Sequence, residues 1–337
     1  MLICVKTTMK YITKFLKKCF GSLRTKLSFK FINHILAKCA KSRSYIETFS
    51  KHADSVHHWI KSSYEEDFKR SFELCVREII RKLRVTHAEI AIDITHEPFY
   101  GTHRDLHVFN TQKEKKYRGE YQYITCCLIN KGKEIPLMAL PVRLGEQTKL
   151  TIELLEYCIS LFKNIKYVLF DRGFYVAEII DFLTAKNINY QMLVPKHKGK
   201  LLSYVDETET LKCFNHQMRY SKKKSVWKPV TRIVVCKNIF DFDWIFATNL
   251  NFKTAKDYVL NYKRRWQIET NYRVEDEAKI KSKSSNYLIR FFYFLTSQLF
   301  HLCWILHKKE SFYVQFKKYL DILEQKLLFE FLRISSI

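Results

Sequence analysis

The chain has 337 residues, of which 47% are hydrophobic and 15% aromatic, enough for a packed core. Seven glycines and five prolines are too few for long flexible linkers or a low-complexity chain. The 59 lysines and arginines outnumber the 34 acidic residues, and the net charge of +25 indicates a polyanionic partner, nucleic acid before an anionic membrane.

The first 84 residues are predicted to be helical and basic. Segments 11–20, 29–40 and 68–84 place apolar residues at three- and four-residue spacing, which is typical of amphipathic helices. Residues 1–50 hold eleven basic side chains and one acidic side chain, Glu47. We interpret residues 1–84 as a region that binds DNA through its phosphates. A merely solvated, lysine-rich surface is the alternative.

From residue 89 onward the pattern changes to strands that alternate with helices. Strands are predicted at 89–95, 121–129, 134–144, 166–171 and 190–196, and helices at 149–164 and 175–187. The order β-β-β-α-β-α-β is that of the ribonuclease-H-like fold. We therefore predict an α/β core over residues 85–196, with a mixed sheet that begins antiparallel and continues parallel.

The remaining chain is predicted to form a β-rich insertion at 197–250 and a helical region at 251–337. The insertion contains successive β segments, with Lys222, Lys223 and Lys224 at a turn. Thr254 and Asp257 have the spacing of a capping box at the start of a long helix.

Residues 287–306 are long and apolar enough to cross a bilayer. Arg290, Gln298 and His301 interrupt this segment, and a charge inside lipid is costly. We expect a buried core helix and no membrane partner.

The ten cysteines include no C-x-x-C pair and no zinc-ligand spacing, so we expect no zinc site. The N-terminus has no convincing secretory signal, and the basic helical pattern continues past the usual length of a transit peptide. We predict a cytoplasmic protein with its thiols reduced.

Three acidic residues fall at places where this fold brings side chains together. Asp93 lies in the first strand, Asp171 ends the fourth strand, and Glu269 lies in the late helix. The first and fourth strands are neighbours in a ribonuclease-H-like sheet, so Asp93 and Asp171 are expected side by side. Such carboxylates repel each other unless a hard divalent cation such as Mg²⁺ binds between them. The alternative for Asp171 is a turn residue that caps the following helix.

The late helix carries a row of side chains at alternating three- and four-residue spacing, which puts them on one face. The row is Tyr262, Arg265, Glu269, Tyr272 and Asp276. Arg265 is placed to orient the carboxylate of Glu269 or to hold a DNA phosphate. An ordinary solvated ion pair is the alternative.

The pattern Tyr262-x-x-Arg265-x-x-x-Glu269 resembles the Y-R-E signature of insertion-sequence DDE transposases. The segments "AIDITHEPFYG" and "LFDRGFY" are similar to the first-aspartate and second-aspartate segments of that family, and "FATNL" to its lead-in. The resemblance extends over residues 90–290. One departure is Asp276, where the family commonly has a lysine; Lys279, Lys281 or Lys283 would substitute for it by a shift of about one turn.

The resemblance implies a DNA transposase that cleaves and joins transposon ends. It implies Asp93, Asp171 and Glu269 as catalytic, metal-binding residues, with two Mg²⁺ ions, or Mn²⁺ as a substitute, in a two-metal mechanism. The expected partners are double-stranded DNA, both transposon ends and target, and a second copy in an active homodimer. A stand-alone nuclease of the same fold and a non-catalytic DNA-binding remnant of a mobile element are the alternative functions.

Further candidates for DNA contact lie around these motifs, and each also has a structural explanation. Tyr262, Arg265, Arg172 and the lysines 222–224 are expected to contact or orient DNA. His96, Tyr100 and His103 follow the first aspartate and would touch the scissile phosphate or fill a polar loop. Trp227 and Trp244 would stack on a displaced base or pack in the core of the insertion.

Overall fold

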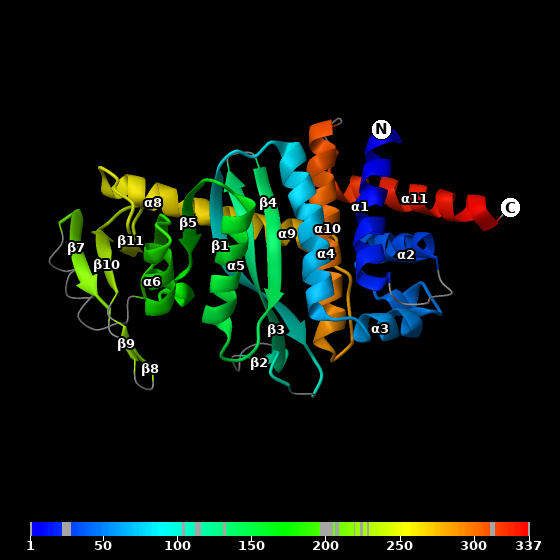
Figure 1. Ribbon diagram of the computed structural model, residues 1–337, viewed down its shortest axis with the longest axis horizontal. Coiled ribbons are helices and arrows are strands. Elements are labelled where there is room, and N and C mark those ends of the chain that lie inside the picture. The colour runs from blue at the N-terminus through cyan, green and yellow to red at the C-terminus, as the bar shows by residue number, and fades with distance from the viewer. Residues whose placement is uncertain are drawn as a thin grey trace.

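A computed structural model describes residues 2–21, 28–102, 105–111, 116–130, 133–195, 205, 209–218, 220–222, 225–227, 229–310 and 314–335. The molecule is elongated, with a large sheet in the middle, a helical bundle at one end and the strands of the insertion at the other (Figure 1).

The central strands have the predicted ribonuclease-H-like order, β4-β3-β1-β5-β6. The strands are β1 (Ala88–Phe99), β3 (Gly119–Asn130), β4 (Lys133–Pro141), β5 (Ile165–Phe170) and β6 (Tyr190–Leu193). β3 is antiparallel to β1 and β4, whereas β5 is parallel to β1 and β6. The predicted fold class is confirmed.

Two details of the core differ from the prediction. β1 continues to Phe99 because Thr95–Phe99 pairs with Gly119–Tyr123 of β3, whereas a loop was predicted after residue 95. A short strand that was not predicted, β2 (Val108–Asn110), pairs with the start of β3.

The insertion extends the central sheet. Its strands are β7 (Leu211–Gln217), β8 (Tyr220–Lys222), β9 (Ser225–Trp227), β10 (Val230–Cys236) and β11 (Trp244–Thr248). β11 is antiparallel to β6, and β10 and β7 follow outward, while β8 and β9 form a separate hairpin. The β-rich character of this region agrees with the sequence prediction.

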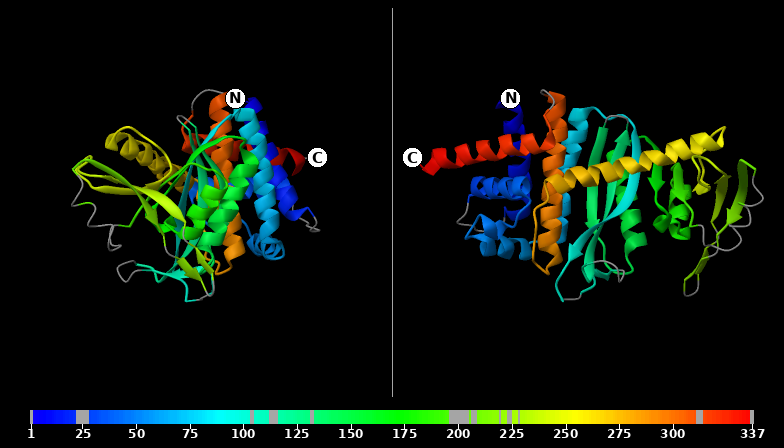
Figure 2. Two further views of the ribbon diagram at one scale, coloured as in Figure 1. Left: turned by 60° about the vertical axis from the view of Figure 1, so that its left-hand side comes forward. Right: turned by 180° about the vertical axis from the view of Figure 1, so that it is seen from behind.

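Helices cover both faces of the sheet. On one face lie α5 (Gln147–Leu161) and α6 (Ala177–Ala185). On the other face a long helical segment crosses the strands (Figure 2, right). It consists of α8 (Ala255–Lys263), the 3₁₀ turn η3 (Arg264–Trp266) and α9 (Gln267–Glu277). It begins with the predicted capping box. The hydroxyl oxygen of Thr254 accepts a hydrogen bond from the backbone N–H of Asp257, and the carboxylate of Asp257 accepts one from the backbone N–H of Thr254.

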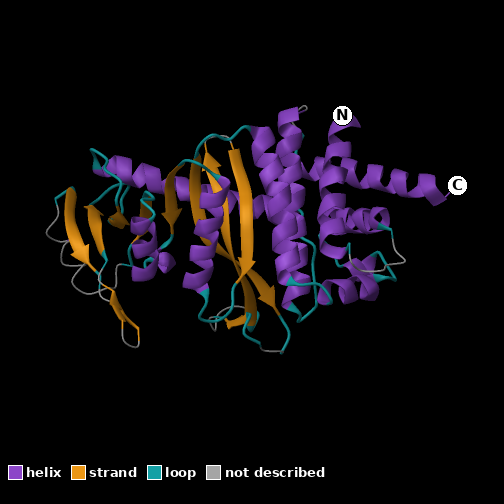
Figure 3. Cartoon of the chain, in the orientation of Figure 1, coloured by secondary structure: helices purple, strands orange, loops and turns teal. Residues whose placement is uncertain are grey.

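The helical bundle joins the two ends of the chain (Figure 3). Its helices are α1 (Leu2–Phe20), α2 (Phe29–Ser42), the 3₁₀ helix η1 (Ile46–Thr48), α3 (Ala53–Lys61), α4 (Glu65–Leu83), α10 (Tyr287–Glu310) and α11 (Phe316–Ser335). α10 packs against α1, α3, α4 and β4. One hydrophobic core therefore runs from Tyr11 to Leu327 and includes one face of the sheet.

α10 is the helix that the sequence predicted to be buried. By length and composition it would be able to cross a membrane, but 83% of its most apolar window is buried inside the protein. Arg290 is buried with it and pairs with Glu97 at 2.7 Å. The expectation of a core helix agrees with this packing.

Candidate active site

Asp93 and Asp171 lie side by side on neighbouring parallel strands. Ile92 of β1 is in register with Phe170 of β5, so the next residue on each strand is one of the two aspartates. Ile92 and Phe170 are completely buried, whereas Asp93 and Asp171 are partly exposed. The two carboxyl groups therefore stand where the buried sheet first reaches solvent, as predicted from the strand order.

The long helical segment brings three further side chains to these aspartates. The hydroxyl of Tyr262 donates to Asp171 Oδ1 at 3.4 Å. Arg265 donates from Nη1 to Asp93 Oδ2 at 2.6 Å and from Nη2 to Glu269 Oε1 at 3.0 Å. Arg265 thus joins the first strand to the helix, and Tyr262, Arg265 and Glu269 of the predicted row lie on the side of the helix that meets the aspartates.

Burial and the neighbouring opposite charges have opposite effects on the pKa of Asp93 and on that of Arg265. Burial raises the pKa of Asp93, and the charge of Asp171 adds to this, while Arg265 and the backbone amide of Ile94 lower it. Burial disfavours the charged form of Arg265, but the surrounding tyrosine and carboxylates raise its pKa above the ordinary value. The guanidinium is therefore charged and partly neutralises the acidic cluster.

α9 is also attached to the sheet next to Asp93. The hydroxyl of Tyr272 lies 2.6 Å from that of Thr125, which donates to the backbone oxygen of Asp93 at 3.4 Å. Ile268, 1% exposed, packs in an apolar cluster with Ala91 and with side chains of β3 and β5. Polar and apolar contacts therefore hold this part of the helix against the strand that carries Asp93.

The donor set suits a hard divalent cation, since Asp93, Asp171 and Glu269 offer only carboxylate oxygens. No group of three or more histidine, cysteine, aspartate or glutamate side chains is gathered to hold one metal ion within the residues that the structure describes. Arg265 stands between Asp93 and Glu269 and bonds to both. The three acids can therefore bind a metal only if the guanidinium of Arg265 moves away from Asp93 and Glu269.

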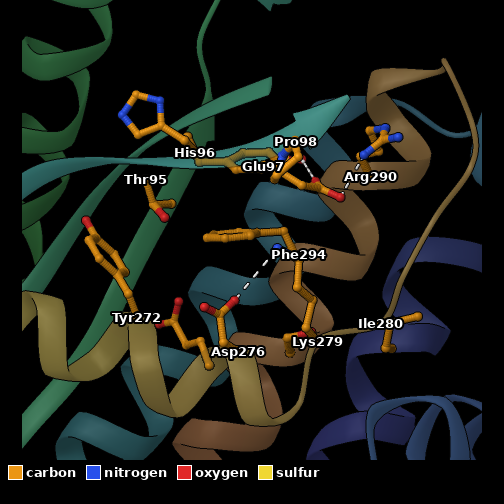
Figure 4. A pocket seen from close by; sticks show the side chains of 13 residues that line it. Thr95, His96, Glu97, Pro98, Tyr272, Asp276, Lys279, Ile280, Arg290 and Phe294 are labelled. Carbon is orange, nitrogen blue, oxygen red and sulfur yellow. Dashed lines mark hydrogen bonds and ion pairs between the residues drawn. The ribbon is translucent and has the colours of Figure 1, made fainter. Parts of the chain in front are cut away.

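A cavity of about 330 Å³ lies beside the site (Figure 4). It is lined by the part of β1 after Asp93, the part of α9 after Glu269, and α10. Asp276 is on its wall, and Lys279 Nζ lies 3.7 Å from the Asp276 carboxylate. Of the lysines considered as substitutes, Lys279 therefore lies next to the position of the family lysine. Lys281 pairs with Tyr45 in an isolated bridge, and Lys283 covers the ring of Tyr45 at 4.9 Å.

The next candidates lie near the end of β1, in the loop that follows it and in the turn after β5. His96 bonds to Glu120 at 2.6 Å, although it also lines the cavity, and Tyr100 is 75% exposed. Arg172 is exposed, so its predicted contact with DNA stays a prediction. Gly173 has no left-handed backbone, and a Cβ there would meet only a side-chain atom of Gln147 at 3.9 Å. The turn after Asp171 therefore does not require a glycine.

The candidates in the insertion are described in part. Lys222 ends β8 and is paired with Ser225, which places the predicted turn between them. Lys223, Lys224 and the earlier candidate His103 lie outside the described residues, as does the side chain of Trp227. Trp244 is only 8% exposed and donates to the carbonyl of Ile239 at 3.0 Å, which agrees with the core-packing alternative.

Two functional candidates were not found from the sequence. Glu89 lies four residues before Asp93, and Arg264 directly precedes Arg265; these two side chains form an ion pair beside the site. In the sequence, Glu89 stands out as an acidic residue in an apolar strand, and Arg264 as the first of two consecutive arginines. Neither identifies its partner without the fold.

Comparison with known proteins agrees with this geometry. The model of the transposase DDE domain family matches residues 86–304. A cryo-EM structure of the piggyBac transposase synaptic complex with hairpin DNA has a similar fold, with a TM-score of 0.60 and 14% sequence identity. The similarity covers 99% of this chain and 81% of that chain. The search of curated proteins found no match. The family model covers well over half of the chain, which therefore belongs to the family of DDE-domain transposases, DNA-cleaving enzymes that use divalent metal ions.

Proposed function

We propose that this transposase cleaves and joins the ends of an insertion sequence, with Asp93, Asp171 and Glu269 as its catalytic carboxylates. The observation that carries the proposal is their convergence from three separate elements, β1, the end of β5 and α9. Arg265 joins Asp93 to Glu269, and Tyr262 bonds to Asp171. Such a set of acids has no evident role in stabilising the fold, because bringing several carboxylates together at a partly buried site is costly.

The three carboxylates would hold two Mg²⁺ ions, or Mn²⁺ as a substitute. When bound, these ions stabilise negative charge on the attacking and leaving oxygens of a phosphoryl transfer. Asp93 is paired within β1, and Asp171 directly follows the paired strand β5, so they form the rigid part of the site. The Glu269 side chain is 52% exposed and can change its rotamer more easily.

Arg265 has two roles in this proposal. It balances the charge of Asp93 and Glu269, and it offers a rigid fork that is suited to a DNA phosphate. Its Nε is buried without a hydrogen-bond partner. A guanidinium that is incompletely satisfied in this position would gain contacts if a phosphate of the DNA end approached.

The partner is proposed to be double-stranded DNA, both the transposon ends and the target. The net charge of +25 favours such a polyanion. Residues 1–84 are proposed as a phosphate-binding region, 85–196 as the catalytic core, 197–250 as the insertion and 251–337 as the catalytic-glutamate helix with the C-terminal helices. Arg172 and the lysines 222–224 would add phosphate contacts. We place the active complex, a homodimer, in the cytoplasm of a prokaryote, at the nucleoid.

The deciding experiment is incubation of the protein with a duplex that carries the element's own ends and a target plasmid, in Mg²⁺ or Mn²⁺. Cleavage at the ends together with joined products supports the transposase reaction. Cleavage without joining indicates a stand-alone nuclease. The absence of metal-dependent cleavage would favour a non-catalytic DNA-binding remnant.

A further inference from the structure

Arg264 fastens the 3₁₀ turn of the long helical segment to three strands of the sheet. Its guanidinium donates to the carboxylate of Glu89 on β1 and to the hydroxyl of Tyr167 on β5. It also donates to the carbonyl oxygen of Ile129 on β3 at 3.1 Å. A single side chain therefore fixes the turn relative to β1, β3 and β5.

Glu89 is the central acceptor of this arrangement and is only 5% exposed. Lys166 Nζ donates to its second carboxylate oxygen at 2.8 Å. Burial alone would raise the pKa of Glu89, but the bonds from Arg264 and Lys166 lower it below its ordinary value. The carboxylate is thus charged, and removing one partner of such a buried pair is costly.

The two consecutive arginines reach two points on the same strand. Glu89 and Asp93 are four residues apart on β1, so both face the side of the sheet that the helix covers, about 13 Å apart. Arg264 bonds to Glu89, and Arg265 bonds to Asp93. Between them, Ala91 packs with Ile268 in an apolar contact, which is not directional and would tolerate sliding along the strand.

We propose that Glu89 and Arg264 are positioning residues for the transposase reaction. Their ion pair fixes the positions of Arg265 and Glu269 relative to Asp93. This inference depends on the proposed catalytic role of Glu269. A misplacement of about 1 Å at a reacting centre can lower the rate about 10²-fold, so loss of the pair should act on kcat.

The test compares full-length Glu89→Gln, Arg264→Gln and Arg264→Lys with the wild type. Glu153→Gln is the matched control, since it breaks the ion pair of Glu153 with Lys69 between α5 and α4, away from the helix. Each variant is measured for kcat and KM of duplex cleavage, for DNA affinity and for Tm.

We expect Glu89→Gln and Arg264→Gln to lower kcat by about 10- to 100-fold, while KM and DNA affinity change by less than about threefold. Arg264→Lys keeps the charge but not the planar fork, so its kcat should lie in between. The double variant should cost little more than either single one, because both remove the same contact. Glu153→Gln should leave kcat unchanged.

A wild-type kcat in Glu89→Gln, or a kcat that falls only in proportion to the folded fraction, would overturn the proposal. If Glu89→Gln does not fold, Arg264→Lys decides by the same criteria. Glu269→Gln is measured alongside. If Glu269→Gln cleaves normally, the catalytic assignment itself is wrong. If Glu269→Gln is inactive while Glu89→Gln is fully active, only the positioning role fails.

Discussion

Arg265 donates to the carboxylate of Asp93 at 2.6 Å and holds positive charge at the place where this proposed metal-binding acid meets the helix. The same guanidinium bonds to Glu269 at 3.0 Å. Arg265 is 6% exposed, so solvent screens these contacts only weakly. A divalent cation that uses both carboxylates must therefore compete with Arg265.

Replacement of Arg265 by Gln should make the DNA-free protein bind Mn²⁺ more tightly. A like charge a few Å away costs on the order of 1 kcal/mol or more, so a gain of about tenfold in affinity is expected. Mn²⁺ titration followed by electron paramagnetic resonance measures this directly. Arg273→Gln removes an exposed arginine of the same helix and should change nothing. Equal Mn²⁺ affinity in wild type and Arg265→Gln would contradict the competition.

Isosteric replacement of any one proposed catalytic acid should abolish cleavage but preserve DNA binding. Asp93→Asn, Asp171→Asn and Glu269→Gln each remove a carboxylate without altering the basic surface. Cleavage of a duplex with the element's ends should fall by about 10³-fold or more, and double variants should cost little more because the acids act as a unit. Asp181→Asn, exposed on α6, is the control. Near-normal cleavage by Glu269→Gln would show that α9 does not supply a catalytic carboxylate.

The predicted DNA-binding role of residues 1–84 is best tested by charge removal. Deleting this region would expose the core, because α1 and α4 pack against α10. Lys17, Lys18 and Lys30 are exposed on α1 and α2, so their joint replacement by Gln leaves the packing intact. We expect weaker DNA binding on every sequence and a salt slope that is flatter by up to about three units. A triple variant with the affinity and salt slope of the wild type would refute the role.

The sequence predicted those parts of the site that follow from strand order and helical spacing. Asp93 and Asp171 end up adjacent because neighbouring parallel strands reach the same sheet edge, and Arg265 and Glu269 follow helical periodicity. The pairing of Glu89 with Arg264 was not predictable, because these residues are 175 positions apart and only the fold brings them together.

The insertion was recognised as β-rich, but its attachment was not predicted. β11 pairs with β6 through Phe246 and Leu193, a contact across a long segment that periodicity cannot assign. The 3₁₀ turn at Arg264–Trp266 was also missed, since its residues have ordinary helical propensities and the turn follows from tertiary contacts.

Glu275 on α9 should make the protein less stable at alkaline pH. Its carboxyl is completely buried, and burial raises its pKa to about 8. The folded state therefore keeps a proton that the unfolded state loses near the ordinary pKa of 4.5, so the stability falls as the pH rises from there to about 8. Glu275→Gln should raise the Tm at about pH 9 and change it little at about pH 5. Exposed Glu156→Gln is the control. Equal Tm shifts at the two pH values would contradict the assignment.

Asp276→Lys should strengthen DNA binding by restoring a lysine at the position where the family commonly has one. The Asp276 side chain is 68% exposed on the cavity wall, two turns beyond Glu269, so a lysine there has room to point toward DNA at the site. Replacing a negative by a positive charge should tighten binding about three- to tenfold and steepen the salt slope by about one unit. Glu277→Lys makes the same charge change at the next, exposed position and controls for net charge alone. If both variants bind DNA equally well, the gain is a general charge effect and position 276 makes no specific contact.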